Sequence, residues 1–363
     1  MKEKKTILHI IQNFGLGGAE TAVVGVLKKL KDYNNVVVTL DPLNQFGNDL
    51  QYDRYYCLNL RSYYLFPTVI GKLRRIIREN KVDLVHSQLY WSTVLARYAC
   101  PKDIPLVTSI QASLTDSVEY KKNWICQLDR ISYKHRPGMI LGVSEHTLHD
   151  YFSFLRLKPG RSGVLYNFVD TAVFNKPANP LPRQHDGTFR LVTVGNLKPQ
   201  KNQLYLLRAF RELKDQRVTL DIFGDGQLEA SFRKIIEEEK LPVRLMGKVR
   251  NLPELLPAYD LFVMSSFYEG FSLAVLEGMA QEKPMLLSDI PTFREQCAGT
   301  AEYFSLQDVD DFVQKVQSLK NDLAKLRKMA AEGRERVLQN FTLDHHLENL
   351  RKIYMEELNL EQP

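Results

Sequence analysis

The residues best suited to chemistry lie in one segment, residues 265–277, whose sequence is Ser-Ser-Phe-Tyr-Glu-Gly-Phe-Ser-Leu-Ala-Val-Leu-Glu. Glu269 follows a strongly apolar stretch, and Glu277 lies within an otherwise apolar helical pattern. A carboxylate on a buried helix needs a partner, because an unpaired charge away from water is costly. The vicinal hydroxyls of a ribose would suit Glu277, and an ion pair with a nearby lysine or arginine is the structural alternative.

The same segment predicts an anion site. The helix should begin near Ser272, and Gly270 can bring backbone close to a ligand. The first amides of a helix have no partner within the helix, and the helix dipole adds positive potential there. We therefore expect the backbone amides of Phe271, Ser272 and Leu273 to be free to face a phosphate.

A second basic element follows the first apolar strand of the second half. Gly195-Asn196 forms a turn, and Lys198 and Lys201 come just before a helical pattern. An ammonium group at Lys201 could meet a pyrophosphate at a helix N-terminus, with Lys198 close by. The structural alternative is a pair of solvated surface lysines.

Two further glycine turns follow strands, at Gly224 and at Gly247. Gly224 would let backbone approach a nucleotide, and the segment at Gly247 could present backbone groups to a base edge. Either turn could instead serve only to reverse the chain.

A glycine turn also follows the first strand of the chain, where Gly17 and Gly18 open a helix. The segment nearly matches the dinucleotide fingerprint G-x-G-x-x-G, but Glu20 replaces the third glycine and would spoil close helix–strand packing. Asp41 could bind a ribose and would support a dehydrogenase, yet a lone glycine loop is a weak signal. We favour the interpretation in which Gly17 and Gly18 let backbone approach a ligand phosphate, over a simple tight turn.

Both halves alternate strand and helix patterns, which predicts parallel sheets covered on both faces. The expected strands are Thr6–Ile11, Val36–Leu40, Tyr55–Leu60, Leu84–His86, Leu106–Ile110, Met139–Val143, Leu191–Val194, Thr219–Phe223, Val243–Met246, Leu261–Met264 and Met285–Leu287. The fold class is α/β, with two Rossmann-like, doubly wound domains facing a cleft. We expect an acceptor-binding domain at 1–175, a nucleotide-sugar domain at 188–345, and a C-terminal helix at 346–363 that returns to the first domain. Asp170–Thr188, rich in proline, is the expected linker.

These motifs together resemble the family-four retaining glycosyltransferases, which have the GT-B fold and an E-x7-E signature. The resemblance runs along nearly the whole chain. The matching segments are Gly17-Gly18-Ala19-Glu20, Val143-Ser144-Glu145, Asn167-Phe168-Val169-Asp170, Val194-Gly195 through Lys201, and Glu269 to Glu277.

The resemblance implies roles for individual residues. Glu269 would hold hydroxyls of the donor sugar, Glu277 the ribose, and Lys201 the pyrophosphate. The amides of residues 271–273 would face the pyrophosphate as well, and Gly17-Gly18 would close over it. Family members need no divalent metal, because lysine and helix dipoles supply the positive charge. The sugar is transferred with retention, and the leaving phosphate accepts the acceptor's proton, so no enzymic nucleophile is assigned.

The chain departs from the family pattern at three positions. Asn196 stands where an arginine is usual, which leaves Lys201 as the only cation unless Lys198 substitutes. Gln111 stands near the reacting sugar where many members have histidine, and it can hydrogen-bond but cannot take a proton. Gln88 replaces a second common histidine.

Composition excludes several other classes. With 44% hydrophobic and 25% charged residues the chain is an ordinary globular protein. Its four cysteines have no paired spacing and fit reduced thiols, and no stretch predicts a signal peptide or a membrane span. We expect a cytoplasmic protein, with peripheral contact to the inner membrane face as an option.

Charge and aromatic residues point to the first domain as the acceptor side. Residues 1–178 hold 24 basic and 15 acidic side chains, whereas residues 179–363 hold 25 basic and 28 acidic ones. The tyrosines at 52, 55, 56, 63, 64 and 90, with Phe66 and Trp91, could face sugar rings or simply pack. The basic amphipathic pattern at Thr68–Asn80 fits an anionic membrane surface as well as an ordinary exposed helix. No nucleic-acid recognition motif accompanies the charge.

The sequence thus predicts a metal-independent, retaining hexosyltransferase with no cofactor. It would use a nucleotide-sugar, by family frequency a UDP-sugar, and a glycan or lipid-linked saccharide acceptor in polysaccharide biosynthesis. The alternatives are a catalytically silent nucleotide-sugar-binding protein and a sugar-nucleotide hydrolase or epimerase of the same fold.

Overall fold

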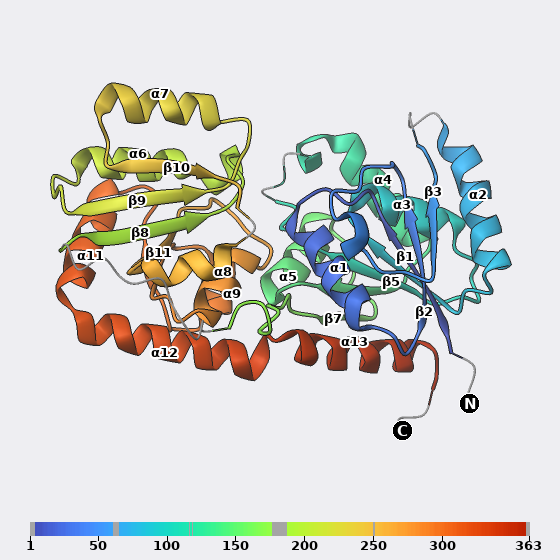
Figure 1. Ribbon diagram of the computed structural model, residues 1–363. Helices are drawn as coiled ribbons and strands as arrows, with labels where there is room; N and C mark the ends of the chain where they lie inside the picture. The colour runs from blue at the N-terminus through green and yellow to red at the C-terminus, as the bar shows by residue number, and fades with distance from the viewer. Residues whose placement is uncertain are drawn as a thin grey trace. The chain divides into compact units, whose positions relative to one another are not determined.

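The structure is a computed structural model that describes residues 4–60, 65–115, 117, 119–175, 187–249 and 251–360. It contains two compact units (Figure 1). Unit 1 comprises Met1–Asn167 and Leu343–Pro363, and unit 2 comprises Phe168–Thr342. The expected bounds were 1–175, 188–345 and 346–363. The first segment of unit 1 ends 8 residues earlier than expected, unit 2 begins 20 residues earlier and ends 3 residues earlier, and the second segment of unit 1 begins 3 residues earlier. Pro177, Pro180 and Pro182 of the expected linker lie outside the described residues, as do Tyr63 and Tyr64.

In unit 1 the described residues form one parallel sheet in the order β3-β2-β1-β4-β5-β6-β7. The strands are β1 Thr6–Ile11, β2 Asn34–Thr39, β3 Arg54–Cys57, β4 Leu84–Gln88, β5 Leu106–Ile110, β6 Met139–Gly142 and β7 Ser162–Val164. The helices are α1 Gly18–Lys29, α2 Phe66–Glu79, α3 Tyr90–Ala99, α4 Asn123–His135, α5 Glu145–Phe154 and α13 Leu343–Glu357. The central strands β1 and β4 are buried throughout, because helices cover both faces of the sheet. They are mainly apolar but also carry buried polar residues such as His9 and His86.

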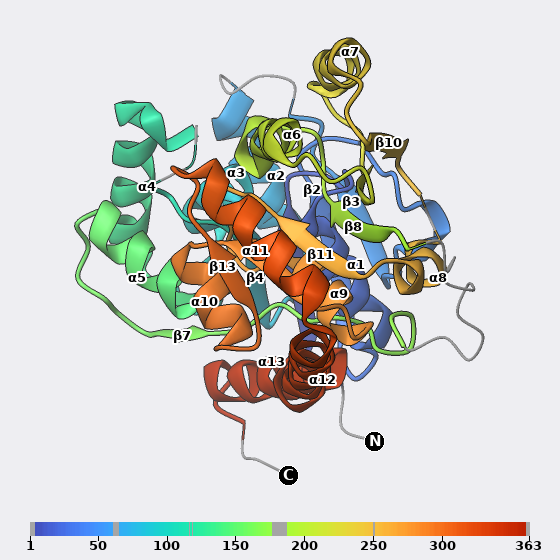
Figure 2. The same ribbon diagram turned by 90° about the vertical axis from the view of Figure 1, so that its left-hand side faces the viewer.

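In unit 2 a second parallel sheet has the order β10-β9-β8-β11-β12-β13 within the described residues. Its strands are β8 Phe189–Val194, β9 Val218–Phe223, β10 Val243–Gly247, β11 Leu261–Met264, β12 Met285–Ser288 and β13 Glu302–Phe304. Its helices are α6 Gln203–Glu212, α7 Glu229–Glu239, α8 Leu252–Leu255, α9 Leu273–Ala280, α10 Pro291–Cys297, α11 Val309–Asn321 and α12 Leu323–Asn340. Helix α11, seen in front of the sheet in Figure 2, contacts α6 and β13, and its residues Phe312 and Val316 belong to the core of unit 2.

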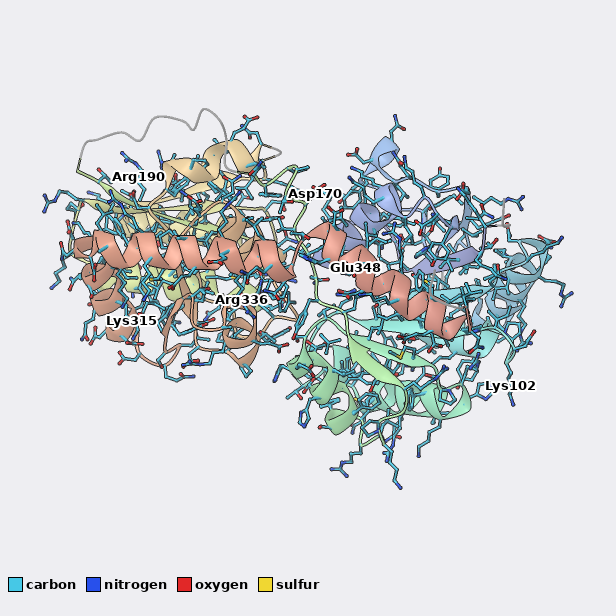
Figure 3. The ribbon with its side chains drawn as sticks, turned by 90° about the horizontal axis from the view of Figure 1, so that it is seen from below. Lys102, Asp170, Arg190, Lys315, Arg336 and Glu348 are labelled. Carbon is cyan, nitrogen blue, oxygen red and sulfur yellow. The ribbon has the colours of Figure 1, made fainter. Side chains whose placement is uncertain are left out.

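The C-terminal helical stretch is two helices, α12 and α13, each assigned to a different unit (Figure 3). The helix stops at Phe341, whose ring packs against Phe271 with centroids 5.1 Å apart. The backbone carbonyl of Phe341 accepts a hydrogen bond from Val169 at 2.9 Å, and Thr342 forms an isolated bridge with Val169. The backbone there bonds to another segment instead of continuing the helix, which separates α12 from α13.

Candidate active site

The centre of the candidate site in unit 2 is an ion pair between Lys201 and Glu269. Lys201 Nζ lies 2.6 Å from Glu269 Oε1, and the two side chains are only 15% and 8% exposed. Ser266 Oγ donates a hydrogen bond to the same carboxylate oxygen at 2.6 Å. Both residues follow the carboxyl ends of neighbouring strands, β8 and β11, which is where ligands bind in sheets of this kind. The sequence assigned these residues to different parts of a donor, and the structure brings them into direct contact.

The loops that carry this pair are tied together by hydrogen bonds to backbone carbonyls. Gln200 Nε2 donates to the carbonyl of Tyr268 at 2.9 Å, and the amide of Phe267 donates to the carbonyl of Gln200 at 2.9 Å. Ser265 Oγ donates to the carbonyl of Asn202 at 2.9 Å. Because several bonds join the two loops, the position of Lys201 relative to Glu269 is fixed by backbone as well as by charge.

Glu277 lies on α9 and is partly buried among apolar side chains. Among the described residues its carboxylate has no hydrogen bond and no ion pair, so the lysine or arginine expected as the structural alternative is not found there. Desolvation raises the pKa of Glu277 to about 7. At neutral pH this carboxyl is therefore close to its pKa. It can accept hydrogen bonds from the hydroxyl groups of a ligand.

The anion site predicted at the start of α9 needs a correction. The amide of Ser272 donates to Oε1 of Gln296 at 3.1 Å, and Gln296 Nε2 donates to the carbonyl of Ser272 at 2.8 Å. The prediction that the Ser272 amide is free is therefore wrong, because the buried side chain of Gln296 from α10 occupies it. Phe271 and Gly270 also make interactions of their own. Leu273 opens the helix as expected.

Close approach of neighbouring backbone explains why a turn of unit 2 contains glycine at position 224. A Cβ on Gly224 (φ +139°) would lie 2.2 Å from the carbonyl oxygen of Gly195. The amide of Gly224 also donates to the carbonyl of Gly247 at 2.9 Å. The loops after β8, β9 and β10 are therefore joined backbone to backbone, and Gly224 makes that close packing possible. Asn196 and Lys198 are exposed in this loop cluster.

In unit 1, Gly17 is the N-cap of α1 and Gly18 its first residue. A Cβ on Gly17 would lie 2.3 Å from Oε2 of Glu20, so the Glu20 carboxylate folds over this helix N-terminus. A carboxylate there is favourable because of the helix dipole. Glu20 thus already supplies the negative charge that the sequence assigned to a ligand phosphate.

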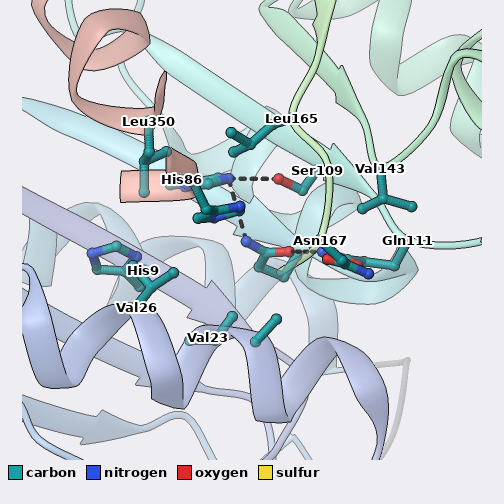
Figure 4. A pocket seen from close by; sticks show the side chains of 13 residues that line it. His9, Val23, Val26, His86, Ser109, Gln111, Val143, Leu165, Asn167 and Leu350 are labelled. Carbon is teal, nitrogen blue, oxygen red and sulfur yellow. Dashed lines mark hydrogen bonds between the residues drawn. The ribbon is translucent and has the colours of Figure 1, made fainter. Parts of the chain in front are cut away.

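Gln111 ends a chain of hydrogen-bonded side chains in unit 1 (Figure 4). Gln111 Nε2 donates to Gln88 Oε1 at 2.7 Å, and Gln88 Nε2 lies 3.3 Å from His86 Nε2. Ser109 Oγ lies 2.8 Å from the same histidine nitrogen, and Tyr354 Oη lies 2.6 Å from His86 Nδ1. With Gln88 and Ser109 as donors, His86 carries its proton on Nδ1, and the amide oxygen of Gln111 is left to accept a hydrogen bond.

His86, Gln88, Ser109 and Gln111 line a cavity of about 20 Å³, enough for one water molecule. His9 and His346 line it as well, and burial lowers the pKa of each to about 4. Burial also holds the pKa of His86 well below its usual range. The three imidazoles at this cavity are therefore uncharged at neutral pH.

Sequence reasoning missed several residues of these sites. Gln296 and Tyr354 lie far along the chain from the groups they hold, and no local pattern connects them. Ser266 offered a signal, because a hydroxyl directly after a buried strand lies at the ligand-binding edge of the sheet. Within the described ranges no group of three or more His, Cys, Asp or Glu side chains could hold a metal ion. No helix in the same ranges combines the length and the apolar character needed to cross a bilayer.

Comparison with known protein families also gives two matches, one mostly within the first segment of unit 1 and one within unit 2. Residues 16–173 match the model for Glycosyltransferase Family 4, and residues 188–322 match the model for Glycosyl transferases group 1.

Two curated relatives cover most of the chain. One is a UDP-Gal:alpha-D-GlcNAc-diphosphoundecaprenol alpha-1,3-galactosyltransferase of Escherichia coli, 23% identical over 314 residues, with 78% of this chain and 78% of that protein covered. The other is an N-acetylgalactosamine-N,N'-diacetylbacillosaminyl-diphospho-undecaprenol 4-alpha-N-acetylgalactosaminyltransferase of Campylobacter jejuni, 26% identical over 333 residues, with 88% and 90% covered.

Solved structures agree in fold. Anabaena Alr3699/HepE, crystallised with UDP and glucose, matches with a TM-score of 0.84 at 17% identity over 96% of this chain and 99% of that one. A glycosyltransferase from Rickettsia africae matches with a TM-score of 0.81 at 18% identity over 99% of this chain and 100% of that one.

Proposed function

Since the chain joins a Glycosyltransferase Family 4 domain to a Glycosyl transferases group 1 domain, and is a glycosyltransferase of the GT-B fold, we propose that it transfers a hexose from a UDP-sugar to a lipid-linked or other glycan acceptor. The transfer retains the anomeric configuration and needs no divalent metal. The observation that carries the proposal is the partly buried Lys201–Glu269 pair, with the unpartnered Glu277 on the adjoining α9.

In this proposal each of the three residues binds a different part of the donor. Lys201 binds the pyrophosphate, Glu277 accepts hydrogen bonds from the ribose hydroxyls, and Glu269 accepts them from the sugar. In the free protein Glu269 neutralises Lys201, so a pyrophosphate must share or replace that contact. Glu269 then becomes available to the sugar at the moment when the phosphate needs Lys201.

The transfer step forms a bond between the acceptor oxygen and the anomeric carbon, while the bond from that carbon to the β-phosphate oxygen breaks. The proton of the acceptor hydroxyl passes to the leaving phosphate oxygen. Lys201 stabilises the charge that develops on this oxygen, and its low exposure strengthens the interaction. The Ser272 amide is already bonded to Gln296 and does not face the phosphate. Lys201 is therefore proposed to supply more of the stabilisation of this negative charge than the sequence alone suggests.

The acceptor is proposed to bind unit 1, close to Gln111. Its amide oxygen is left as an acceptor by the bond from Gln111 Nε2 to Gln88, and it can receive a hydrogen bond from an acceptor hydroxyl. This contact orients the hydroxyl but removes no proton. The names of both curated relatives state a diphosphoundecaprenol-linked substrate, which supports a lipid-linked acceptor here.

A thermal-shift panel of UDP-, GDP-, ADP- and dTDP-sugars, each with EDTA and with magnesium, tests the proposal. Ligand at about a hundred times its Kd should add roughly 2.7 kcal/mol of stability. A shift with the UDP series that survives EDTA supports the proposal, and a shift that requires magnesium contradicts its metal-free part.

Turnover then separates the alternatives. Release of UDP only when an acceptor is present supports a transferase. Release without an acceptor indicates a hydrolase. Binding with no turnover on any lipid-linked or soluble glycan indicates a silent nucleotide-sugar binder, which the exposed Asn196 and the occupied Ser272 amide would favour.

A further inference from the structure

The outer face of α4 exposes two large apolar side chains to water. Trp124 is 52% exposed and Ile131 is 55% exposed. They are seven residues apart, so they lie on the same side of the helix, two turns from each other. The opposite side of α4 is committed to the core of unit 1 through Ile125, Asp129 and Tyr133.

Among the described side chains of α4 and of Lys121 and Lys122 before it, the exposed charges are all positive. Lys121, Lys122 and Lys134 are exposed beside Trp124 and Ile131. Asp129 is the only acidic residue of α4, and it is buried in an ion pair with Arg97 at 2.5 Å. Within the described side chains of α4, the exposed residues are therefore basic, apolar or neutral polar, such as Asn123 and Gln127, and none is acidic.

An aromatic row extends the same surface toward α2. The ring of Trp124 lies 5.9 Å from that of Trp91 on α3, and Trp91 lies 6.0 Å from Phe66 at the start of α2. Leu65 beside Phe66 is 44% exposed. The helices are also joined farther along, because Arg74 of α2 donates to the carbonyl of Tyr98 on α3, and Tyr98 stacks on His135 of α4.

Exposed basic residues continue along α2 at positions 72, 74, 75 and 78. The one acidic residue of that helix, Glu79, lies 3.7 Å from Arg75, so the helix keeps a net positive charge. The positive, partly apolar surface thus spans two helices that flank α3.

We infer that Trp124 and Ile131, with the flanking lysines, dock unit 1 on an anionic lipid bilayer. Tryptophan is favoured at the boundary between headgroups and acyl chains, where one side of the ring is apolar and the other is hydrated. Lysine is depleted at the centre of protein–protein interfaces but is attracted to anionic lipid headgroups. The inference rests on the proposed function, in which the acceptor is lipid-linked. Docking would hold unit 1 at the membrane surface where such an acceptor resides.

The chain has only two tryptophans, which makes a direct test possible. The Trp91→Phe variant leaves Trp124 as the sole indole, and its fluorescence is recorded with vesicles of phosphatidylglycerol and of phosphatidylcholine. We expect a shift of the emission to shorter wavelength with the anionic vesicles only. The shift should decrease at high salt, because salt screens the lysine–headgroup attraction.

Co-sedimentation with the same vesicles measures affinity. The Trp124→Ser/Ile131→Ser variant should bind at least tenfold more weakly, as expected for withdrawing two large apolar side chains. The Lys121→Gln/Lys122→Gln variant should lose roughly thirtyfold, since each basic residue near an anionic surface contributes about a factor of five. Leu338→Ser and Lys328→Gln on α12 are matched controls, being exposed residues of the same kinds in unit 2, and should change nothing.

All the variants replace exposed residues, and unfolding curves confirm that each is folded. Equal binding by the α4 variants and the parent protein would overturn the inference, as would an unchanged Trp124 emission. Self-association that disappears in the Trp124→Ser/Ile131→Ser variant, without vesicle binding, would assign the surface to a second copy instead. Turnover on a water-soluble acceptor is measured separately, so a failure of docking and a failure of the proposed transferase activity are distinguishable.

Discussion

Lys201 and Glu269, 68 residues apart in sequence, form a partly buried ion pair with a Nζ–Oε1 distance of 2.6 Å. From the sequence, Lys201 is expected to bind the pyrophosphate of the donor and Glu269 its sugar. In the structure each is also the other's counterion, so a variant of one changes the environment of both.

Lys201→Ala should weaken binding of free UDP by roughly 1.5–3 kcal/mol, the range for hydrogen bonds to charged groups. Titration calorimetry with UDP measures the loss. Lys198→Ala is the matched control, because Lys198 belongs to the same loop but is exposed. Equal losses in the two variants would mean that the pyrophosphate does not select Lys201.

Glu269→Gln should raise the Kd for UDP-sugar while leaving that for free UDP unchanged or lower. The variant removes the carboxylate that competes with the pyrophosphate for Lys201, and it also removes an acceptor of sugar hydroxyls. The ratio of the two dissociation constants is the measured quantity. If free UDP were weakened as much as UDP-sugar, the division of the donor between Lys201 and Glu269 would be wrong.

UDP binding at pH 7 should release protons from Glu277. Its pKa of about 7 leaves the carboxyl partly protonated in the free protein, and ribose hydroxyls that donate to it favour the ionised form. Calorimetry in two buffers of different ionisation enthalpy gives the number of protons released. In Glu277→Gln the release should vanish and UDP should bind more weakly, and an undiminished release in that variant would place its source elsewhere.

Gln111→Ala should lower kcat by roughly tenfold or more while leaving UDP affinity unchanged, because the residue belongs to unit 1 and is proposed to orient the acceptor. Gln88→Ala should cause a smaller loss of the same kind, since Gln88 holds the amide of Gln111 in its orientation. Steady-state kinetics with saturating donor separates kcat from donor binding. Full activity in Gln111→Ala would exclude the proposed contact.

Unit 1 should lose stability in mild acid. His9 and His346 have folded pKa values of about 4, against an ordinary value of 6.5. Above pH 6.5 both states are neutral and there is no effect, whereas below it the unfolded chain takes up protons that the folded unit does not. Each imidazole should therefore cost up to about 3 kcal/mol as the pH falls from 6.5 to 4.

Urea unfolding of the parent protein and of His346→Asn at pH 7.5 and pH 5 checks this. The asparagine amide can still donate to the carbonyl of Tyr166, which His346 Nδ1 approaches at 2.7 Å. The parent should lose about 2 kcal/mol more than the variant between the two pH values. Parallel losses would show that His346 does not titrate with unfolding.

The sequence predicts the two-sheet architecture because buried parallel strands are continuous apolar runs, as at Val36–Val38 and Leu261–Met264. Short edge strands escape this signal, and β7 and β13, of three residues each, were not expected. Gly17, Lys201 and Glu269 lie after strands as predicted, since the order of strand and helix sets the edge on which loops emerge.

What the sequence cannot give is the pairing of polar groups across long separations. The bond from Gln296 to the Ser272 amide, and the contact of Tyr354 with His86 across 268 residues, depend on how α10 and α13 pack. Local spacing marked Ser272 as a helix start correctly but could not show that its amide has a partner.

The discontinuity of unit 1 has a consequence for how the chain is made. Its second segment, Leu343–Pro363, is synthesised only after all of unit 2. Until Tyr354 arrives, His86 lacks its phenolic partner and the α1 side of the sheet lacks α13. During synthesis unit 2 can fold before α13 has been made, whereas the core of unit 1 is then still incomplete. Synthesis of α13, rather than synthesis of residues 1–167, is thus the step that completes the core of unit 1.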